Sequence, residues 1–384
     1  MTKSNLFVVL GTRPEAIKLA PLVLAARARD DCAVTVCNTG QHADMAASIL
    51  DLFGIAPDID LAVMRPRQSL TDITGAVLRA LEPVLAARRP DWLVVQGDTT
   101  SAFAASLAAF YARIPVAHVE AGLRTGNILA PWPEEMNRLL ITDVARLHFA
   151  PLESNAANLR REGVPTDRIV VTGNTGIDAL KWIVGRLGGD KRLGERAQAA
   201  LDATGLAALR AGSGARLVLV TGHRRESFGV GFESICAALA ELARRFPDHA
   251  FVYPVHPNPE VRNTVQRELG GRLSNLYLIE PLDYLPFVLL MTRAELILTD
   301  SGGIQEEGPS IGKRVIVLRE VTERAEGVET GLIRLAGTDR ARIVADAAAA
   351  LEGRWAPKTE SSDVYGDGRA AERIVSALAA ASRP

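Results

Sequence analysis

The chain has 384 residues, which predicts two domains, because single hydrophobic cores rarely keep growing to that length. Its 44 basic and 45 acidic side chains give a formal net charge of −1, so its charge does not point to nucleic acid or an anionic membrane as a partner. The three cysteines, Cys32, Cys37 and Cys236, are too few and too irregularly spaced for a disulfide framework or a zinc site, and we expect buried thiols.

The first apolar run has six residues before Gly11, which is too short for the core of a signal peptide. No apolar stretch approaches the length of a membrane span. We therefore expect a cytoplasmic protein.

Short apolar runs alternate with amphipathic helical stretches along the first half, for example 15–30 and 101–113. Nearly continuous apolar runs such as LFVVL and LVVQ are typical of parallel strands buried on both faces. This alternation predicts a doubly wound parallel sheet. We expect its strands near 5–10, 33–38, 92–96, 115–119, 146–150 and 168–172.

The same pattern starts again after a polar helical stretch at 181–213. The fold class we predict is therefore α/β, with two doubly wound Rossmann-like domains, 1–178 and 179–367, facing a central cleft. Ligands of such sheets bind at the carboxyl ends of the strands, where the polar segments GTR, GDTTS, HVEAG, TGHRR, VHPNP and TDSGG fall. The second set of strands is expected near 217–223, 251–256, 276–281, 296–301 and 315–320.

Two strand-to-helix turns are candidate anion sites. At Ser301, Gly302 and Gly303, backbone N–H groups and a helix dipole would attract a phosphate, although a tight turn capped by serine is the structural alternative. Glu307, further along the same helix, has the chemistry to accept both hydroxyls of a ribose. Arg13 and Lys18 follow the first strand and would supply cations to a diphosphate, unless they are merely solvated.

Several acids follow strands of the first domain. Asp98 and Glu120 come directly after buried strands, and Glu134 and Glu135 follow Pro-Trp-Pro in what we expect to be a loop. One such acid alone favours a structural ion pair, whereas three at one sheet edge favour acid/base chemistry.

Two histidines, His223 and His256, end strands of the second domain and are expected opposite those acids. No histidine pair has metal-ligand spacing, and no G-x-G-x-x-G follows the first strand. We expect no metal and no cofactor.

The long motifs identify a resemblance. GTRPEAIKLAPL, GDTTSAFAASLAAFY, PVAHVEAGLRTGN, PWPEEMNR, TGHRRESFG and DSGGIQEEGPSIGK resemble, in order, the bacterial non-hydrolysing UDP-N-acetylglucosamine 2-epimerases from Phe7 to Gly368. The resemblance implies a GT-B-like architecture in which the C-terminal helix 368–384 packs back onto the first domain. With it we expect a homodimer that serves cell-surface polysaccharide biosynthesis.

The resemblance also implies roles for individual residues, carried over motif by motif. Phe287 would pack on uracil, although alone it would be assigned to the core. The catalytic group is expected at Asp98, Glu120, Glu134 and His223, and the UDP contacts at Arg13, Lys18, His256, Phe287, Ser301, Gly302, Gly303, Glu307 and Arg324.

The activity implied is reversible epimerisation at C2 of UDP-N-acetylglucosamine to UDP-N-acetylmannosamine, by loss of UDP to 2-acetamidoglucal and its re-addition. A hydrolysing 2-epimerase and a 2-epimerase of a UDP-2,3-diacetamido sugar are close alternatives. A GT-B glycosyltransferase is more remote, because the clustered acids and PWPEEMNR disfavour it. A non-catalytic UDP-sugar sensor would require loss of a catalytic acid, and all are present.

A second, activating substrate pocket is also implied, at Gln41, His42, Asp44, Arg67 and Glu135. Relatives carry a glutamine where this chain has Asp44. A carboxylate near the second diphosphate disfavours binding, unless Asp44 pairs with a cation such as Arg67. We expect weaker activation by UDP-N-acetylglucosamine than in relatives with glutamine there.

Overall fold

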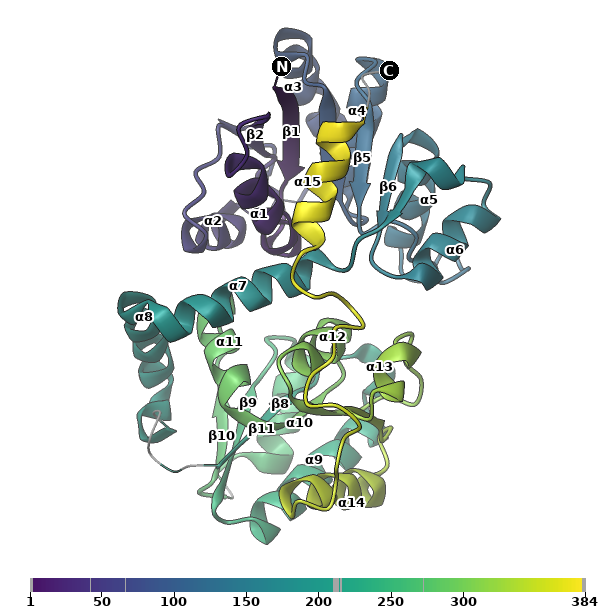
Figure 1. Cartoon of the computed structure of the whole chain (residues 1–384). Coiled ribbons are helices and arrows are strands. Elements are labelled where there is room, and N and C mark those ends of the chain that lie inside the picture. The colour runs from purple at the N-terminus through teal and green to yellow at the C-terminus, as the bar shows by residue number, and fades with distance from the viewer. Residues whose placement is uncertain are drawn as a thin grey trace. The chain divides into compact units, whose positions relative to one another are not determined.

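The computed structural model describes residues 3–41, 43–65, 67–209, 214, 216–271 and 273–381, without the side chains of residues 43, 44 and 208. The chain forms two compact units (Figure 1). Unit 1 comprises residues 1–179 and 366–384, and unit 2 comprises residues 180–365. No helix in the described part of the chain is both long and apolar enough to cross a membrane.

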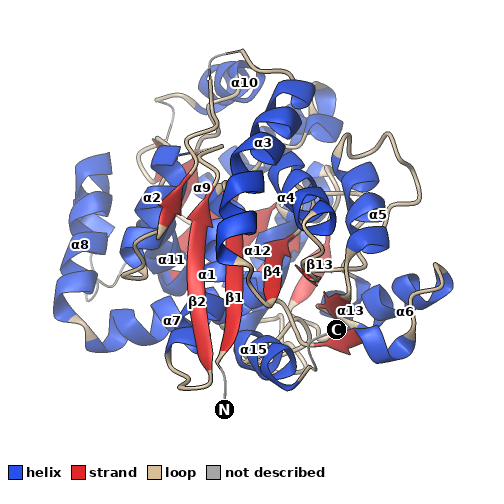
Figure 2. Cartoon of the chain, turned by 90° about the horizontal axis from the view of Figure 1, so that it is seen from above, coloured by secondary structure: helices blue, strands red, loops and turns tan. Residues whose placement is uncertain are grey.

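Unit 1 is built on a parallel sheet of seven strands in the order β3-β2-β1-β4-β5-β6-β7. β1 lies between β2 and β4, so the strand order reverses at the β1/β4 pair (Figure 2). The strands are β1 Ser4–Leu10, β2 Cys32–Asn38, β3 Ile59–Asp60, β4 Trp92–Gln96, β5 Val116–Val119, β6 Leu147–Ala150 and β7 Ile169–Val171. The helices are α1 Arg13–Arg27, α2 Ala43–Leu52, α3 Leu70–Arg88, α4 Thr100–Tyr111, α5 Glu134–Val144, α6 Glu153–Arg161, the first residues of α7 Thr175–Gly189, and α15 Ala370–Ala380.

Unit 2 repeats this design with six parallel strands in the order β10-β9-β8-β11-β12-β13. The order reverses at the β8/β11 pair, which corresponds to β1/β4 of unit 1. The strands are β8 Arg216–Thr221, β9 His249–Pro254, β10 Leu276–Ile279, β11 Ala294–Thr299, β12 Arg314–Val317 and β13 Ile333–Leu335. The helices are α8 Lys191–Leu201, α9 Val230–Arg245, α10 Pro259–Leu269, α11 Tyr284–Arg293, α12 Gly302–Ser310, α13 Ala325–Glu329 and α14 Arg340–Leu351.

Burial of both sheet faces explains the apolar runs in the sequence. Every residue of β4 is buried, and so are the last five residues of β1. Phe7 and Val95 belong to one hydrophobic cluster of unit 1, which α3 and α4 help to form with residues such as Val77 and Ala105. Two doubly wound parallel sheets were predicted, and this fold class is confirmed. The cysteines are buried and free, as expected.

The structure differs from the sequence-based elements in a few places. β3 and β13 were not predicted, because β3 has only two residues and the charged Arg334 interrupts the apolar run of β13. The first helix was expected over 15–30 but spans Arg13–Arg27, since Thr12 caps it and Glu15 completes the capping box. Glu134 and Glu135 were expected in a loop, and this was wrong, because they form the first turn of α5.

Helix α15 packs against α1 within unit 1 (Figure 1). Its first turn is held by Asp178, whose Oδ1 accepts a hydrogen bond of 2.7 Å from the Ala371 backbone N–H. Asp178 is buried, and its Oδ2 has no hydrogen-bond partner among the described residues. Burial raises the pKa of Asp178 to about 6.

The raised pKa of Asp178 predicts how the stability of the fold depends on pH. The folded chain retains a proton that the unfolded chain releases, so the contribution of Asp178 to stability is lost as the pH rises from about 4 through about 6. A shift of about two units corresponds to about 3 kcal/mol. We expect Asp178→Asn, which cannot ionise, to be more stable than the wild type at pH 8 and to lose most of that advantage at pH 4.5, as measured by thermal unfolding.

Asp367 is the matched control, because its ion pair with Arg373 lowers its pKa to about 2. The contribution of Asp367 to stability depends on pH in the opposite direction to that of Asp178. Its ionised form stabilises the fold above about pH 4, so Asp367→Asn should lower the melting temperature at pH 8. An Asp178→Asn variant that is destabilised equally at both pH values would show that the charge itself is needed to cap α15.

Candidate active site

The candidate acids of unit 1 lie where the sheet reverses its strand order. β4 ends at Gln96 and leads into Asp98, and neighbouring β5 ends at Val119, directly before Glu120. The β1–α1 turn contributes Thr12 and Arg13 to the same sheet edge. Ligands of doubly wound sheets bind at this position, because loops from both sides of the reversal diverge there.

Glu120 is held in a defined orientation. Its φ of +65° is in the left-handed region, which is uncommon outside glycine and ends the extended backbone of β5. Lys18 Nζ donates to both carboxylate oxygens, at 2.6 and 2.5 Å, and the Gln96 side-chain amide donates to Oε2. The carboxyl side chain is only 13% exposed. Lys18, predicted to bind UDP, is therefore an ion-pair partner of Glu120.

Asp98 has a cation of its own. Arg138 Nε donates to Oδ2 at 2.8 Å, and Asn137 Nδ2 donates to the Asp98 backbone carbonyl at 2.8 Å. Burial raises the pKa of Asp98; Arg138 and Lys18 act to lower it, and the neighbouring Glu120 carboxylate acts to raise it further. Two acids thus lie close enough to influence each other, and each has its own positive partner.

The turn between these acids depends on a buried histidine. His118 Nε2 lies 2.8 Å from the Gly97 carbonyl, and the Gly97 N–H donates to the Val119 carbonyl. Gly97 has a φ of +71°, a conformation that favours glycine. Burial lowers the pKa of His118 to about 3, so the ring is neutral at physiological pH and donates to the carbonyl through Nε2–H. His118 thereby fixes the backbone next to Asp98.

The β1–α1 turn is organised by Glu15. Glu15 is buried and accepts hydrogen bonds from the backbone N–H groups of Gly11 and Thr12 and from the hydroxyl of Thr99. It therefore joins the turn after β1 to the turn after β4. Arg13, predicted to bind UDP, is exposed and makes no ion pair with any residue in the described part of the chain.

The two glutamates of the Pro-Trp-Pro-Glu-Glu segment differ in environment. Glu134 is half-buried at the start of α5. Glu135 is fully buried: Oε1 accepts from the N–H groups of Thr125 and Gly126, and Oε2 accepts from Arg138 at 2.9 Å. Burial acts to raise the pKa of Glu135, but these hydrogen bonds together lower it.

The remaining residues of the expected second pocket are only partly described. Gln41 accepts a hydrogen bond of 2.6 Å from the hydroxyl of Ser101, at the start of α4. Arg67 is exposed with a φ of +61°. His42 and the side chain of Asp44 lie outside the described residues.

In unit 2, a buried aspartate shapes the corresponding sheet edge. Asp300 follows β11, and its Oδ2 accepts from the backbone N–H groups of His223 and Arg224 at 2.6 and 2.7 Å. The His223 ring lies with Nδ1 3.4 Å from Asp300 Oδ1 and stacks on His256 at 4.9 Å between centroids. Burial and the neighbouring His223 lower the pKa of His256. The structure thus brings His223 and His256 together.

The turn after Asp300 begins α12, and the guanidinium of Arg324 lies close to it. Ser301 precedes the helix, and a Cβ at Gly302 would lie 2.8 Å from the Arg324 guanidinium, so any other residue there would displace Arg324. Arg324 Nε donates to Glu306 at 2.8 Å. The N-terminus of α12 and a guanidinium are thus adjacent, which suits an anion. Among the other expected UDP contacts of this unit, Gly303 is exposed, and Glu307 and Phe287 are half-buried.

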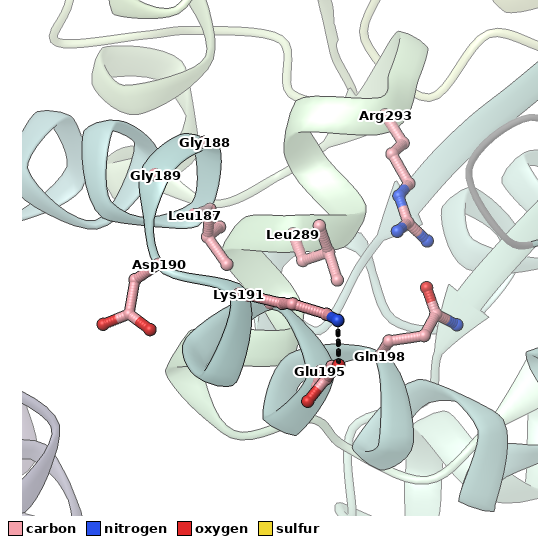
Figure 3. Close-up of a pocket in the computed structure, with 10 residues that line it drawn as sticks. Leu187, Gly188, Gly189, Asp190, Lys191, Glu195, Gln198, Leu289 and Arg293 are labelled. Carbon is pink, nitrogen blue, oxygen red and sulfur yellow. Dashed lines mark ion pairs between the residues drawn. The ribbon is translucent and has the colours of Figure 1, made fainter.

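A separate cavity of about 690 Å³ lies where α8 follows α7 and faces α11 (Figure 3). Lys191 and Glu195 form an ion pair of 3.8 Å in it, and Arg293 lines another side. None of the candidate catalytic or UDP-binding residues lines this cavity, so it is distinct from the sheet edge described above.

Comparisons with known proteins identify the family of the chain. A family described as UDP-N-acetylglucosamine 2-epimerase matches residues 24–379. A protein of Salmonella typhimurium named UDP-N-acetylglucosamine 2-epimerase is 52% identical over 376 residues, which cover 97% of this chain and 98% of that protein. The chain belongs to the UDP-N-acetylglucosamine 2-epimerase family.

Solved structures give the same result. The crystal structure of UDP-GlcNAc 2-epimerase from Neisseria meningitidis, bound to UDP-GlcNAc, matches with a TM-score of 0.86 at 43% identity, covering 97% of this chain and 99% of that one. The S. aureus MnaA–UDP structure matches with a TM-score of 0.80 at 40% identity, covering 98% and 96%. These matches confirm the family resemblance inferred from the motifs and its GT-B-like fold.

Sequence reasoning within this family missed the residues that hold the candidate groups. Arg138, Asn137, Gln96 and His118 position Asp98 or Glu120, and Asp300 positions His223. A signal existed for four of them, since His118 belongs to PVAHVEAGLRTGN, Asn137 and Arg138 to PWPEEMNR, and Asp300 to DSGG. Their contacts, however, cross large distances in the sequence.

Proposed function

We propose that this protein interconverts UDP-N-acetylglucosamine and UDP-N-acetylmannosamine without releasing the free sugar. The observation that supports this most directly is the pair Asp98 and Glu120, two adjacent acids with separate cationic partners at the reversal point of a parallel sheet. Asp98 has a raised pKa, which is the tuning expected of a group that exchanges protons near neutral pH.

The chemistry explains why more than one acid is needed. The C2 proton of the sugar is not adjacent to a carbonyl, so its simple removal would leave an unstabilised carbanion. Loss of UDP from C1 together with the C2 proton avoids this and gives 2-acetamidoglucal. UDP then adds back while a proton reaches the other face of C2. Asp98, Glu120 and Glu134 of unit 1 are the acid/base groups we propose for the two faces.

In this proposal unit 2 binds UDP. The turn formed by Ser301, Gly302 and Gly303 and the guanidinium of Arg324 would stabilise the departing diphosphate, as would His223. Glu307 would hold the ribose and Phe287 the uracil. From unit 1, Arg13, which is exposed, would add a further cation. His256 would support His223 through their stacked rings.

The decisive experiment is NMR of the protein with UDP-N-acetylglucosamine alone in deuterium oxide. We expect an equilibrium mixture of the two UDP-sugars with deuterium at C2. Product that keeps protium at C2 would rule out acids in exchange with solvent. Free N-acetylmannosamine as the main product would instead identify the hydrolysing reaction.

Glu307→Ala should weaken UDP binding by at least about 10-fold, because hydrogen bonds to a charged group contribute about 1.5–3 kcal/mol each. Calorimetry with UDP measures this directly. Glu329→Ala removes an exposed glutamate of the same unit and should leave the affinity unchanged. Normal UDP affinity combined with slow turnover in Glu307→Ala would contradict the ribose-binding role.

The second pocket at Gln41, His42, Asp44, Arg67 and Glu135 remains a proposal, and Asp44 provides its test. Replacing Asp44 with glutamine removes a negative charge and should strengthen activation by UDP-N-acetylglucosamine by about 5- to 150-fold in affinity. The assay follows the reverse reaction from pure UDP-N-acetylmannosamine, with and without a trace of UDP-N-acetylglucosamine. A strong lag in the wild type that the trace removes, unchanged in the variant, would show that Asp44 does not weaken this control.

We also propose a cytoplasmic homodimer. Light scattering should then give about twice the chain mass of 41.1 kDa.

A further inference from the structure

Arg138 occupies a fixed position between two carboxylates of unit 1. Its Nε and Nη2 lie 2.8 Å from Asp98 Oδ2, and its Nη1 donates to Glu135 Oε2 at 2.9 Å. All three guanidinium nitrogens therefore make polar contacts, and the side chain is only 14% exposed. A guanidinium suits this position because its planar fork can hold two acids at once.

The far end of this arrangement is anchored to the backbone. Glu135 uses Oε1 for the N–H groups of Thr125 and Gly126 and leaves Oε2 for Arg138. Its side chain is 2% exposed. Both oxygens accept hydrogen bonds within unit 1, so in this structure Glu135 orients Arg138.

Helix α5 also fixes the main chain of Asp98. Asn137, next to Arg138, donates to the Asp98 backbone carbonyl at 2.8 Å. One turn of one helix therefore holds Asp98 by its backbone and its carboxylate. Among the described residues, the charged groups that act most strongly on Asp98 are Arg138 from α5, Lys18 from α1 and the Glu120 carboxylate after β5.

We propose that Arg138 is a positioning residue that keeps Asp98 ionised and oriented, and that Glu135 orients Arg138. The claim that Arg138 orients Asp98 for the reaction rests on the proposed function. The claim that Arg138 keeps Asp98 ionised does not. Lys18 is already engaged by Glu120, so Arg138 is the cation that compensates the negative charge of Asp98 most closely. Without Arg138, two neighbouring carboxylates would share one cation.

The first test is carbon NMR titration of the Asp98 carboxyl in ¹³C-aspartate-labelled, substrate-free protein, with the signal assigned by its absence in Asp98→Asn. In Arg138→Met the pKa of Asp98 should rise by about 1 unit or more, because loss of a close opposite charge disfavours the ionised form. Arg124→Met is the matched control. Arg124 is 9% exposed and pairs with Glu162 at 2.7 Å in the same unit, so its loss should leave the Asp98 titration unchanged.

The second test separates charge from orientation. Glu135→Gln leaves the Arg138–Asp98 pair in place, so the pKa of Asp98 should not rise while kcat falls. Arg138→Lys retains the charge without the fork and should restore the titration of Asp98 more fully than kcat. In Arg138→Met, kcat should fall further at pH 6 than at pH 8, since less Asp98 is ionised at pH 6.

These measurements distinguish two kinds of failure. An Asp98 titration that is the same in Arg138→Met and the wild type would overturn the charge role, whether or not the protein is an epimerase. A normal kcat in Glu135→Gln, with the wild type active, would overturn the orienting role. An inactive wild type would refute the proposed function, and with it the orienting role, and would leave the titration to decide the charge role.

Discussion

Asp98→Asn should lower the turnover of UDP-N-acetylglucosamine by about 10²–10⁴-fold, the usual effect of removing a general acid/base group. The amide has nearly the same shape and can still accept a hydrogen bond from Arg138, so the fold and the sheet edge should be retained. It cannot exchange a proton at neutral pH. Initial rates followed by proton NMR of the two UDP-sugars measure the loss, and circular dichroism with thermal unfolding checks the fold.

Asp91→Asn is the matched control for this prediction. Asp91 directly precedes β4, at the opposite end from Asp98, and accepts a hydrogen bond from the Asn5 backbone N–H. Its replacement should leave turnover near the wild-type value. Near-normal turnover of Asp98→Asn would return Asp98 to a structural role as the partner of Arg138.

Much of the fold was predictable because its signals are local. β1 and β4 are buried on both faces and therefore appear in the sequence as uninterrupted apolar runs. Strand ends were also predictable, since polar residues such as Asp98 and His223 follow each run. β3 was not predictable, because a two-residue strand owes its existence to pairing with β2 and not to its own sequence.

The pairing of charges could not be predicted for a different reason. Lys18 and Glu120 are 102 residues apart, and Asp98 and Arg138 are 40 apart. Sequence places such groups at one edge of a sheet, but the choice of partner depends on strand order and on side-chain direction. Lys18 was therefore predicted to bind UDP and was found on Glu120.

The second large effect on turnover that we expect comes from the pair of Glu120 and Lys18. Glu120→Gln should lower turnover by about 10²–10⁴-fold, because it removes an acid/base group whose orientation Lys18 and Gln96 maintain. Lys18→Met should lower kcat as well, since a partly buried carboxylate would lose its positive partner. Steady-state kinetics on both variants, with UDP affinity from calorimetry, give the comparison.

The double variant decides what Lys18 does. If Lys18 acts by holding Glu120, then Lys18→Met should cost nothing further once Glu120 is glutamine, and the double variant should be as slow as Glu120→Gln alone. If Lys18 instead binds the diphosphate, as predicted from the sequence, the two effects should multiply and UDP affinity should fall in Lys18→Met. The structure favours the first outcome, in which Lys18 acts by holding Glu120. The Lys18 ammonium donates hydrogen bonds to both carboxylate oxygens of Glu120, the shorter at 2.5 Å.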